Sequence, residues 1–462
     1  MAEYRKKTVF IIVIICFILL LTRLYYVSLS ARNIVFMDFW RSINFLIDPV
    51  MTGEFPWEIC WEARFGQRNF LQLFLISCDI RFMRMNCLWE AYAGMIVIFF
   101  ISILLIRKWN TISSTYENER SNTALFECII ILPIIYIPFC LQQWEIMSLQ
   151  FSFAFMIRLF CYYLIMAKVD KLLHEDMPLN SYVLWGVFTA IVIALVSQLY
   201  WPALLLSLIA AWGVDFVKNK RIYKKKTLAF WGPVSMGVFA YLYNLQMTGQ
   251  ENNGIVSTLV SKDYWLAVLY MFPGSLIPDS VASIFSLSFI IGIAVILIAI
   301  IIMTVIYFFL FKMEQKSYFP MMLCAYGLFS VGIISYSRFS IFGPSYMLAS
   351  RYTCETLIIW VGVVMALAMM IKDNKRLFII PMVVIVLLVA YADRVEMTVA
   401  PYRGNYKDEL LKMLPELDKY SDDELAGFQS PPELVRDGTR LLEKYSLNVF
   451  DDTQIDGALI VN

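Results

Sequence analysis

The stretch "VFMDFWRSINFLIDPVMTGEFPWEICWEARFGQRN", Val35 to Asn69, concentrates charged side chains directly after the first apolar run of the chain. Asp38 lies between aromatic residues in "MDFW". A carboxylate in such surroundings can take a proton from a hydroxyl group, so Asp38 is the candidate general base. The alternative is a solvated aspartate at a membrane interface, beside a belt of aromatic side chains.

Four arginines are candidates for binding a phosphate group. Arg64 and Arg68 are four residues apart, so on a helix they would share one face, where two guanidinium groups can grip phosphate oxygens. Arg338 and Arg351 flank "FGPS", a turn signal at the mouth of two apolar runs. Each interpretation has an alternative. Arg64 and Arg68 could lie on a surface helix that contacts anionic lipid headgroups. Arg351 could simply extend its charged group to the membrane interface.

Further side chains have the types that hold a sugar ring, by stacking on an aromatic face and hydrogen bonding to hydroxyls. They are Gln143, Trp144 and Glu145 in "CLQQWEIMSLQFSF", and Tyr200 and Trp201 in "QLYWP". Glu62, two residues before Arg64, could orient an arginine or contact a sugar hydroxyl. Helix capping and anchoring at a membrane interface are the alternatives.

The composition indicates an integral membrane protein. The 462 residues are 60% hydrophobic and only 16% charged, whereas a soluble domain is about 45–50% apolar and roughly a quarter charged. The net charge of +1 and the lack of a basic stripe give no sign of nucleic acid binding. A single histidine, His174, argues against histidine metal sites and Ser-His-Asp catalysis. The sequence contains no dense cluster of carboxylates that would suggest a metal site. It also contains no G-x-x-x-x-G-K-[ST] motif that would suggest nucleotide binding.

Eleven apolar runs are long enough to cross a bilayer, which takes about 20 residues of helix. The runs are 8–28, 89–106, 123–141, 150–167, 182–198, 201–217, 227–245, 284–311, 319–335, 352–371 and 376–392. The first is too long for a signal peptide and has no A-x-A site, so we expect it to stay uncleaved. Only "QLYWP" separates the fifth run from the sixth, which leaves one broken helix as an alternative.

Lysine and arginine predict the orientation, because cytoplasmic loops carry an excess of both. With a cytoplasmic N-terminus, the even-numbered spans end inside at "RKW", "KVDK", "KNKRIYKKK", "KMEQK" and "KDNKR", all basic. Residues 1–392 then form the transmembrane domain, and the external parts are an amphipathic loop 30–88, a loop 244–280 and a small extracytoplasmic tail 393–462. Every candidate site residue lies on the external side.

Two local features of the external parts are also predicted. The end of the second loop, "YWLAVLYMFPGSLIPD", is too short and too broken by proline for a span, and a re-entrant or interfacial helix fits better. One disulfide is possible among Cys60, Cys78 and Cys87 of the first loop, but its pairing cannot be deduced from the sequence.

Five segments occur in an order that resembles a broad group of bacterial multi-span membrane proteins within the GT-C class of glycosyltransferases. They read "MDFW", "WEARFGQRNFLQLFLI", "QQWEIMSLQFSF", "ASRYTCETLIIW" and "PPELVRDGTRLLEKYSLNVF". Two positions depart from the pattern of that group. Ala63 stands where the group has histidine, and Cys354 replaces the second threonine of a "RYTT" element.

The resemblance implies a GT-C-like fold and transfer of a sugar from a polyprenyl-phosphate donor to a cell-envelope glycan or polymer. Asp38 would deprotonate the acceptor hydroxyl, and the anomeric carbon would be attacked in line, with inversion. Arg351, Arg338, Arg64 and Arg68 would bind the donor phosphate. No cofactor is implied here, although some GT-C enzymes use a divalent metal. The partners would be the bilayer, the lipid donor and the glycan acceptor, in a bacterial cell membrane.

Three other functions are alternatives. A transporter or flippase of lipid-linked glycans should carry polar groups in mid-span, whereas these span centres are mostly Ile, Val, Leu and Phe, which favours an enzyme. A non-catalytic scaffold of envelope assembly is motivated by Ala63. A polymerase or ligase of polysaccharide chains is the third.

Overall fold

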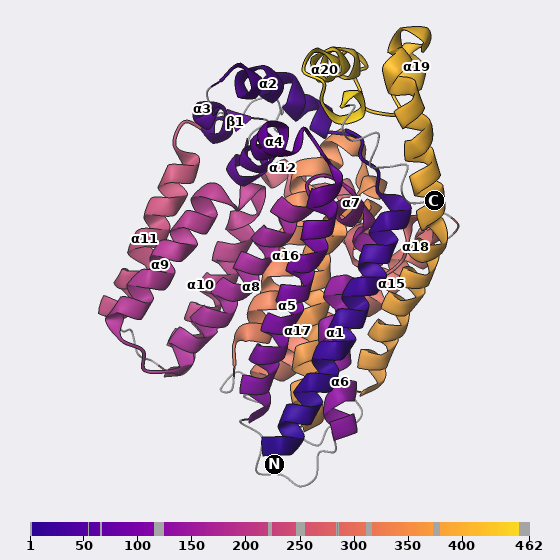
Figure 1. The fold of residues 1–462 in the computed structure, drawn as a ribbon. Helices are drawn as coiled ribbons and strands as arrows, with labels where there is room; N and C mark the ends of the chain where they lie inside the picture. The colour runs from indigo at the N-terminus through magenta and orange to yellow at the C-terminus, as the bar shows by residue number, and fades with distance from the viewer. Residues whose placement is uncertain are drawn as a thin grey trace.

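The computed structural model describes residues 2–53, 55–64, 67–114, 124–219, 224–245, 255–282, 284, 286–310, 317–372 and 379–451. In this part of the chain the regular structure is helical apart from one hairpin of two short strands, Ala63–Arg64 (β1) and Gln67–Arg68 (β2). Long helices pack side by side, and short helices cover one end of the bundle (Figure 1). We call the covered end the loop face; α1 begins at the opposite end.

Within the described residues, eleven helices make the bundle: α1 Ala2–Ser30, α5 Leu88–Ser114, α6 Ala124–Tyr136, α8 Ser152–His174, α9 Leu179–Leu195, α10 Trp201–Asn219, α11 Lys224–Leu242, α15 Leu287–Leu310, α16 Phe319–Phe342, α17 Thr353–Lys372 and α18 Ile379–Met413. The short α-helices are α2 Phe39–Thr52, α3 Trp57–Trp61, α4 Phe70–Met83, α7 Trp144–Ser148, α12 Ile255–Val260, α13 Lys262–Gly274, α14 Asp279–Ala282, α19 Asp422–Leu425 and α20 Glu433–Lys444. The 3₁₀ turns are η1 Ile137–Phe139, η2 Leu141–Gln143, η3 Gln198–Tyr200, η5 Pro344–Leu348, η6 Ser350–Tyr352, η8 Leu414–Lys419 and η9 Asn448–Phe450.

Eight segments of the described chain are long and apolar enough to cross a membrane. They are Phe10–Ser30, Leu88–Ser114, Ile129–Ser148, Ser152–His174, Gln198–Lys218, Leu287–Ile306, Phe319–Phe339 and Ser350–Ile371. The other three predicted spans are also helical, as α9, α11 and the first half of α18. Of these, α9 has only 17 residues, α11 begins with three lysines, and α18 carries several charges. The chain therefore has the architecture of an all-α multi-pass membrane protein.

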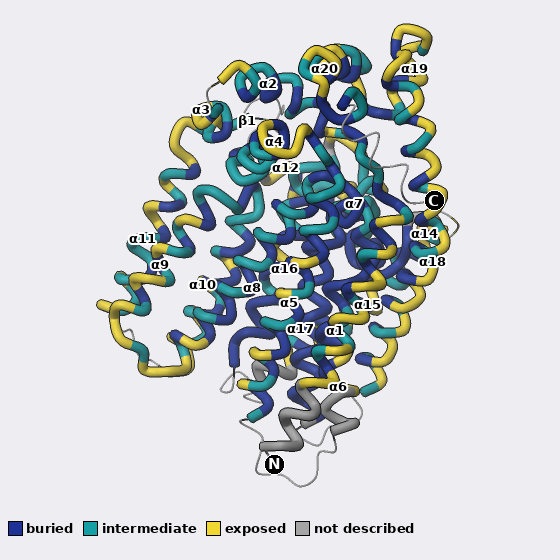
Figure 2. The backbone as a smooth tube through the Cα atoms, in the orientation of Figure 1, coloured by how far each residue is buried: buried dark blue, intermediate teal, exposed yellow. Residues whose placement is uncertain are grey.

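The burial of the helices matches a bundle surrounded by lipid. All of the apolar window of Ser350–Ile371, which contains α17, is buried, whereas only 28% of the window in α15 is buried. Figure 2 shows the buried centre and the exposed outer helices. The exposed side chains of α15 include Val295, Ile296 and Met303, which are suited to contact lipid tails rather than water.

The fifth and sixth predicted spans are two antiparallel helices and not one broken helix. The chain reverses between α9 and α10, where Gln198 has a φ of +52°. Tyr182 near the start of α9 and Trp212 near the end of α10 line the same cavity. These two helix ends can share a cavity only if the helices run in opposite directions.

The amphipathic first loop folds together with the C-terminal tail. In α2 the buried residues recur every three or four positions, as Phe39, Trp40, Ile43, Leu46, Ile47 and Val50, which gives the helix one apolar face. This face packs in a hydrophobic cluster with Val435 and Leu442 of α20, separate from the cluster of the bundle. Cys60, Cys78 and Cys87 of the loop are free thiols, so the disulfide left open by the sequence is not formed.

The boundary at residue 392 between membrane domain and tail does not coincide with a break in the structure. Helix α18 runs through it without interruption for 35 residues, which is about 52 Å at 1.5 Å per residue. A hydrocarbon core is about 30 Å thick. The helix is therefore long enough to cross the bilayer and carry the tail to the loop face, where the tail and the loop share one core.

Asp79 of α4 gives this extramembrane unit a predictable pH dependence. Its side chain is buried, and burial raises its pKa from 3.8 to about 7, partly offset by the Trp89 indole and the Asn86 backbone N–H. The folded state then binds the proton more tightly than the unfolded state. The contribution of Asp79 to stability is therefore full below about pH 4 and falls by about 1.4 kcal/mol for each pH unit up to about pH 7.

Thermal unfolding in nanodiscs at pH 5 and pH 7.5 measures this effect. Asp79→Asn should flatten the dependence, whereas Asp437→Asn, which changes an exposed carboxylate on α20, should retain it. An equally steep fall in stability for Asp79→Asn would show that another group is responsible.

Candidate functional site

Asp38 lies at the loop face, at the N-cap position of α2, but its side chain does not cap the helix. An aspartate there usually accepts a hydrogen bond from the first turn. Instead the carboxylate, 62% exposed, lies near one group three residues further along and two groups from distant parts of the chain. The Nε of Arg41 is 3.6 Å away, the Nη1 of Arg351 is 3.9 Å away, and the Nε2 of Gln429 donates a hydrogen bond of 3.1 Å. Asp38 is thus an accessible carboxylate with two guanidinium groups within 4 Å.

Glu145 holds Arg351 in place. Its Oε2 accepts hydrogen bonds of 2.8 Å from the Ser350 hydroxyl and from the backbone N–H of Arg351. Its Oε1 lies 3.3 Å from Nη2 of the same arginine. The Tyr346 ring lies 5.5 Å from the guanidinium carbon. Glu145 is therefore an orienting group for Arg351 at this site.

Two arginines at the loop face retain donors for an anion. The Nε of Arg351 is buried and has no hydrogen-bond partner among the described residues. Arg338, near the end of α16, is half-buried and makes no hydrogen bond or ion pair within the described chain; it lies within electrostatic range of Tyr352. A phosphate placed between these guanidinium groups would supply the acceptor oxygens that both arginines lack.

No protein family model, curated protein or solved structure matches this chain. The chemistry of the site is therefore argued from its own geometry. We call Asp38, Glu145 and Arg351 the acid–arginine cluster. Within the described residues, no group of three or more His, Cys, Asp or Glu side chains is arranged to hold a metal ion.

The helix expected to carry Arg64 and Arg68 is absent, because the two residues lie on opposite strands of the β1–β2 hairpin. Arg64 pairs with Glu62 at 2.6 Å, and its guanidinium lies 4.0 Å from the centre of the Phe45 ring. Among the described residues, no hydrogen bond or ion pair joins this pair to Asp38. The two arginines therefore do not form a joint phosphate grip.

Arg68 is a structural residue. It is buried, and its Nε donates a hydrogen bond of 2.7 Å to the carbonyl of Tyr241. Its other guanidinium nitrogens donate to the carbonyls of Trp61 and Tyr243. The Tyr241 and Tyr243 carbonyls lie near and just beyond the end of α11, whereas Trp61 is the last residue of α3. Arg68 therefore satisfies carbonyls at two helix ends and joins the loop to the bundle.

The contrast between the two arginines leads to a stability prediction. Arg68→Ala should lower the free energy of unfolding by at least about 2 kcal/mol, because it leaves buried carbonyls unpaired. Arg64→Ala should change it by less than about 1 kcal/mol, because that ion pair is exposed. Thermal unfolding of both variants in the same nanodiscs compares them. Equal losses of stability would contradict the structural role of Arg68.

The polar side chains after the third span point into the protein. Gln143 donates a hydrogen bond of 2.6 Å to the carbonyl of Pro138. One face of the Trp144 ring is covered by the guanidinium of Arg403, 3.4 Å from the ring centre. Arg403 in turn pairs with Glu396 at 2.6 Å. Of this segment only Glu145 takes part in the acid–arginine cluster.

Tyr200 and Trp201 also serve packing. The Tyr200 ring lies 3.9 Å from the guanidinium carbon of Arg158. The Trp201 ring lies 5.7 Å from the ring of Tyr241. Neither contacts Asp38 or Arg351 among the described interactions, so both residues pack against bundle side chains rather than lying at the site of Asp38.

The structure reveals a buried network that the sequence analysis missed. The Arg158 guanidinium pairs with the Glu355 carboxylate and donates a hydrogen bond of 2.9 Å to Gln198, while Tyr326 donates to the other oxygen of Glu355. Arg158 interrupts the apolar run "FMIRLF". A charged residue inside a span usually has a buried partner, so this position could have indicated the network from the sequence. Gln429 lies 391 residues from Asp38, and nothing in the sequence indicates that contact.

Proposed function

We propose that this chain is a GT-C-like membrane glycosyltransferase. It would move a sugar from a polyprenyl-phosphate donor to an extracytoplasmic cell-envelope glycan. The observation that carries the proposal is the acid–arginine cluster, in which an accessible carboxylate lies 3.9 Å from a guanidinium at one end of a helical membrane bundle. A lipid-linked donor explains why a transfer site would lie at the end of such a bundle.

In the proposed reaction Asp38 takes the proton of the acceptor hydroxyl. The acceptor oxygen forms a bond to the anomeric carbon while the bond from that carbon to the phosphate oxygen breaks, with inversion. The lipid phosphate leaves with the bonding electrons, and Arg351 and Arg338 stabilise its charge. The sugar must enter between base and phosphate, so substrate replaces the direct contact between Asp38 and Arg351. Glu145 keeps Arg351 in place during this exchange.

We further propose that the loop face is extracytoplasmic in a bacterial cell membrane and that the N-terminus is cytoplasmic. The charge distribution supports this orientation. The end of the bundle opposite the loop face carries Lys108, Lys171, Lys218 and Lys224–Lys226 near helix ends, as expected for cytoplasmic segments. No metal is part of the proposal.

A transfer assay on the purified full chain in nanodiscs tests the proposal. It uses radiolabelled polyprenyl-phosphate sugars as donors and a cell-envelope polysaccharide fraction as acceptor. Arg351→Ala should lower the transfer rate by about 10²-fold, because one preorganised donor to the leaving phosphate is lost. Arg440→Ala, which removes an exposed arginine of α20, should leave the rate unchanged.

Two results would contradict the proposal. One is that no donor transfers its sugar with the wild-type chain. The other is movement of a lipid-linked glycan across the bilayer without formation of a glycosidic bond, which would favour a flippase.

A further inference from the structure

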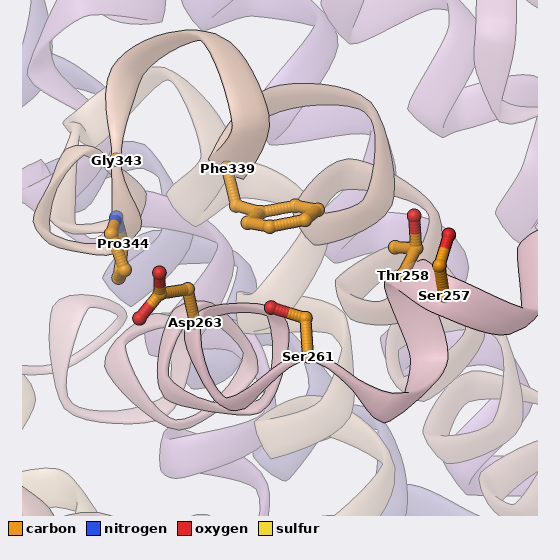
Figure 3. Close-up of a pocket in the computed structure, with 7 residues that line it drawn as sticks. All are labelled: Ser257, Thr258, Ser261, Asp263, Phe339, Gly343 and Pro344. Carbon is orange, nitrogen blue, oxygen red and sulfur yellow. The ribbon is translucent and has the colours of Figure 1, made fainter. Parts of the chain in front are cut away.

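A cavity of about 430 Å³ opens where the end of α16 and the start of η5 meet α12 and α13 (Figure 3). Nothing in the sequence analysis or in the proposed mechanism uses it. Its lining residues are Ser257, Thr258, Ser261, Asp263, Phe339, Gly343 and Pro344. The volume lies within the range of about 300–1,000 Å³ that is usual for small-molecule sites.

The lining favours an uncharged ligand rich in hydroxyl groups. Among the described residues it contains three hydroxyls, one carboxylate and one aromatic ring, and no lysine, arginine or histidine. Without a positive charge, the cavity is poorly suited to a phosphate. Figure 3 shows the Phe339 ring above the Ser261 hydroxyl and the Asp263 carboxylate. A sugar ring presents both complementary surfaces, an apolar C–H face for the aromatic ring and hydroxyl donors for the carboxylate.

Neighbouring residues fix the Phe339 ring, and the backbone conformation of Gly343 shapes the edge of the cavity. The Phe339 ring packs edge-on against Tyr264, with 6.0 Å between ring centres. At the rim Gly343 has a φ of +79°, a conformation that favours glycine, and a Cβ there would meet nothing within 4 Å. Backbone conformation rather than lack of space therefore accounts for a glycine at this position.

A short segment joins the cavity to the acid–arginine cluster. Pro344 begins η5, and Tyr346 within η5 stacks on Phe342 at 4.3 Å between ring centres. The same Tyr346 ring lies 5.5 Å from the guanidinium carbon of Arg351. A ligand in the cavity would therefore lie next to the segment that positions the phosphate-binding arginine.

We propose that this cavity binds a neutral sugar unit of the acceptor glycan. Phe339 supplies the stacking surface, and Asp263 and Ser261 bond to the sugar hydroxyls. The assignment to the acceptor rests on the proposed function, whereas saccharide binding by the cavity does not. Arg351 and Arg338 would hold the anionic lipid phosphate, so the donor phosphate and the neutral acceptor sugar would bind at separate sites joined by η5.

Binding is tested without any donor. The full chain in nanodiscs of neutral lipid is applied to an array of bacterial surface polysaccharides, printed intact and after periodate oxidation, which destroys sugar diols. Wild type should bind intact glycans, and Phe339→Ala and Asp263→Asn should each weaken that binding roughly tenfold. The control variants Phe329→Ala, on the same helix, and Asp437→Asn should bind as wild type.

The inference is overturned if wild type binds no intact glycan, binds oxidised glycans equally well, or is unaffected by both cavity variants. The transfer assay separates this inference from the proposed function. Phe339→Ala should raise the KM for acceptor roughly tenfold with little change in kcat or in the KM for donor. Transfer with an unchanged acceptor KM would overturn the cavity assignment alone. Glycan binding that the cavity variants weaken, without any transfer, would overturn the proposed function alone.

Discussion

Asp38→Asn is expected to lower the initial rate of sugar transfer by about 10²–10⁴-fold, the usual contribution of a positioned general base. The amide has nearly the shape of the carboxylate but cannot take the proton of the acceptor hydroxyl. Because the Asp38 side chain is 62% exposed and does not cap α2, the substitution should leave folding intact. The measurement is the transfer rate of purified protein in nanodiscs, together with its thermal midpoint.

Asp437→Asn is the matched control for Asp38→Asn. Asp437 is 63% exposed and pairs with an arginine three residues further along the chain, as Asp38 does. The control should therefore keep the wild-type rate. Full transfer by Asp38→Asn with a normal thermal midpoint would exclude Asp38 as the base. In that case the acid–arginine cluster would serve binding alone.

Arg158→Leu is expected to destabilise the protein by about 3–5 kcal/mol, because it leaves the buried Glu355 carboxylate without its ionic partner. Both side chains of this pair are almost completely buried, at 1% and 0% exposed. The loss should appear as a lower thermal midpoint and a smaller yield of folded protein after detergent extraction. Because Glu355 lies four residues after Arg351 along the chain, transfer should fall as well.

The double variant Arg158→Leu/Glu355→Leu separates the cost of an unpaired charge from the value of the pair. Apolar replacement of a whole buried ion pair is often close to neutral, so the double variant should recover much of the lost stability. A double variant that is as unstable as the sum of both single variants would contradict this account. The remaining partners, Gln198 and Tyr326, would then carry more of the stability than the ion pair does.

The two long loops, 30–88 and 244–280, show which structural features local sequence patterns can predict. The apolar periodicity that makes the first loop amphipathic is found in α2, and the short helix expected near the end of the second loop is α13. The spacing of Arg64 and Arg68 led to a wrong prediction, because a spacing of four residues suits a helix but does not show that one forms. Here a hairpin places Arg68 against the free carbonyls near the end of α11, a contact across 173 residues.

The C-terminal tail shows a second limit of prediction from the sequence, which concerns where the last helix ends. A drop in hydropathy marks residue 392 as the end of the last span, but helix α18 continues to Met413. Helical hydrogen bonds do not depend on hydropathy, so a helix can leave the membrane without a break. Only the packing of α20 on α2 places Gln429 within 3.1 Å of Asp38.

The sequence by itself determined the class of the protein and the regions where its charges gather. Backbone groups in lipid must be satisfied within helices, and charges are costly there, so apolar runs and loop charges can be read directly from composition. The tertiary structure decided which of the charged residues meet. Asp38, Glu145, Arg351 and Gln429 lie on four segments far apart in the sequence, and tertiary packing brings them together. The same packing turned Arg68, Trp144 and Tyr200 towards other partners.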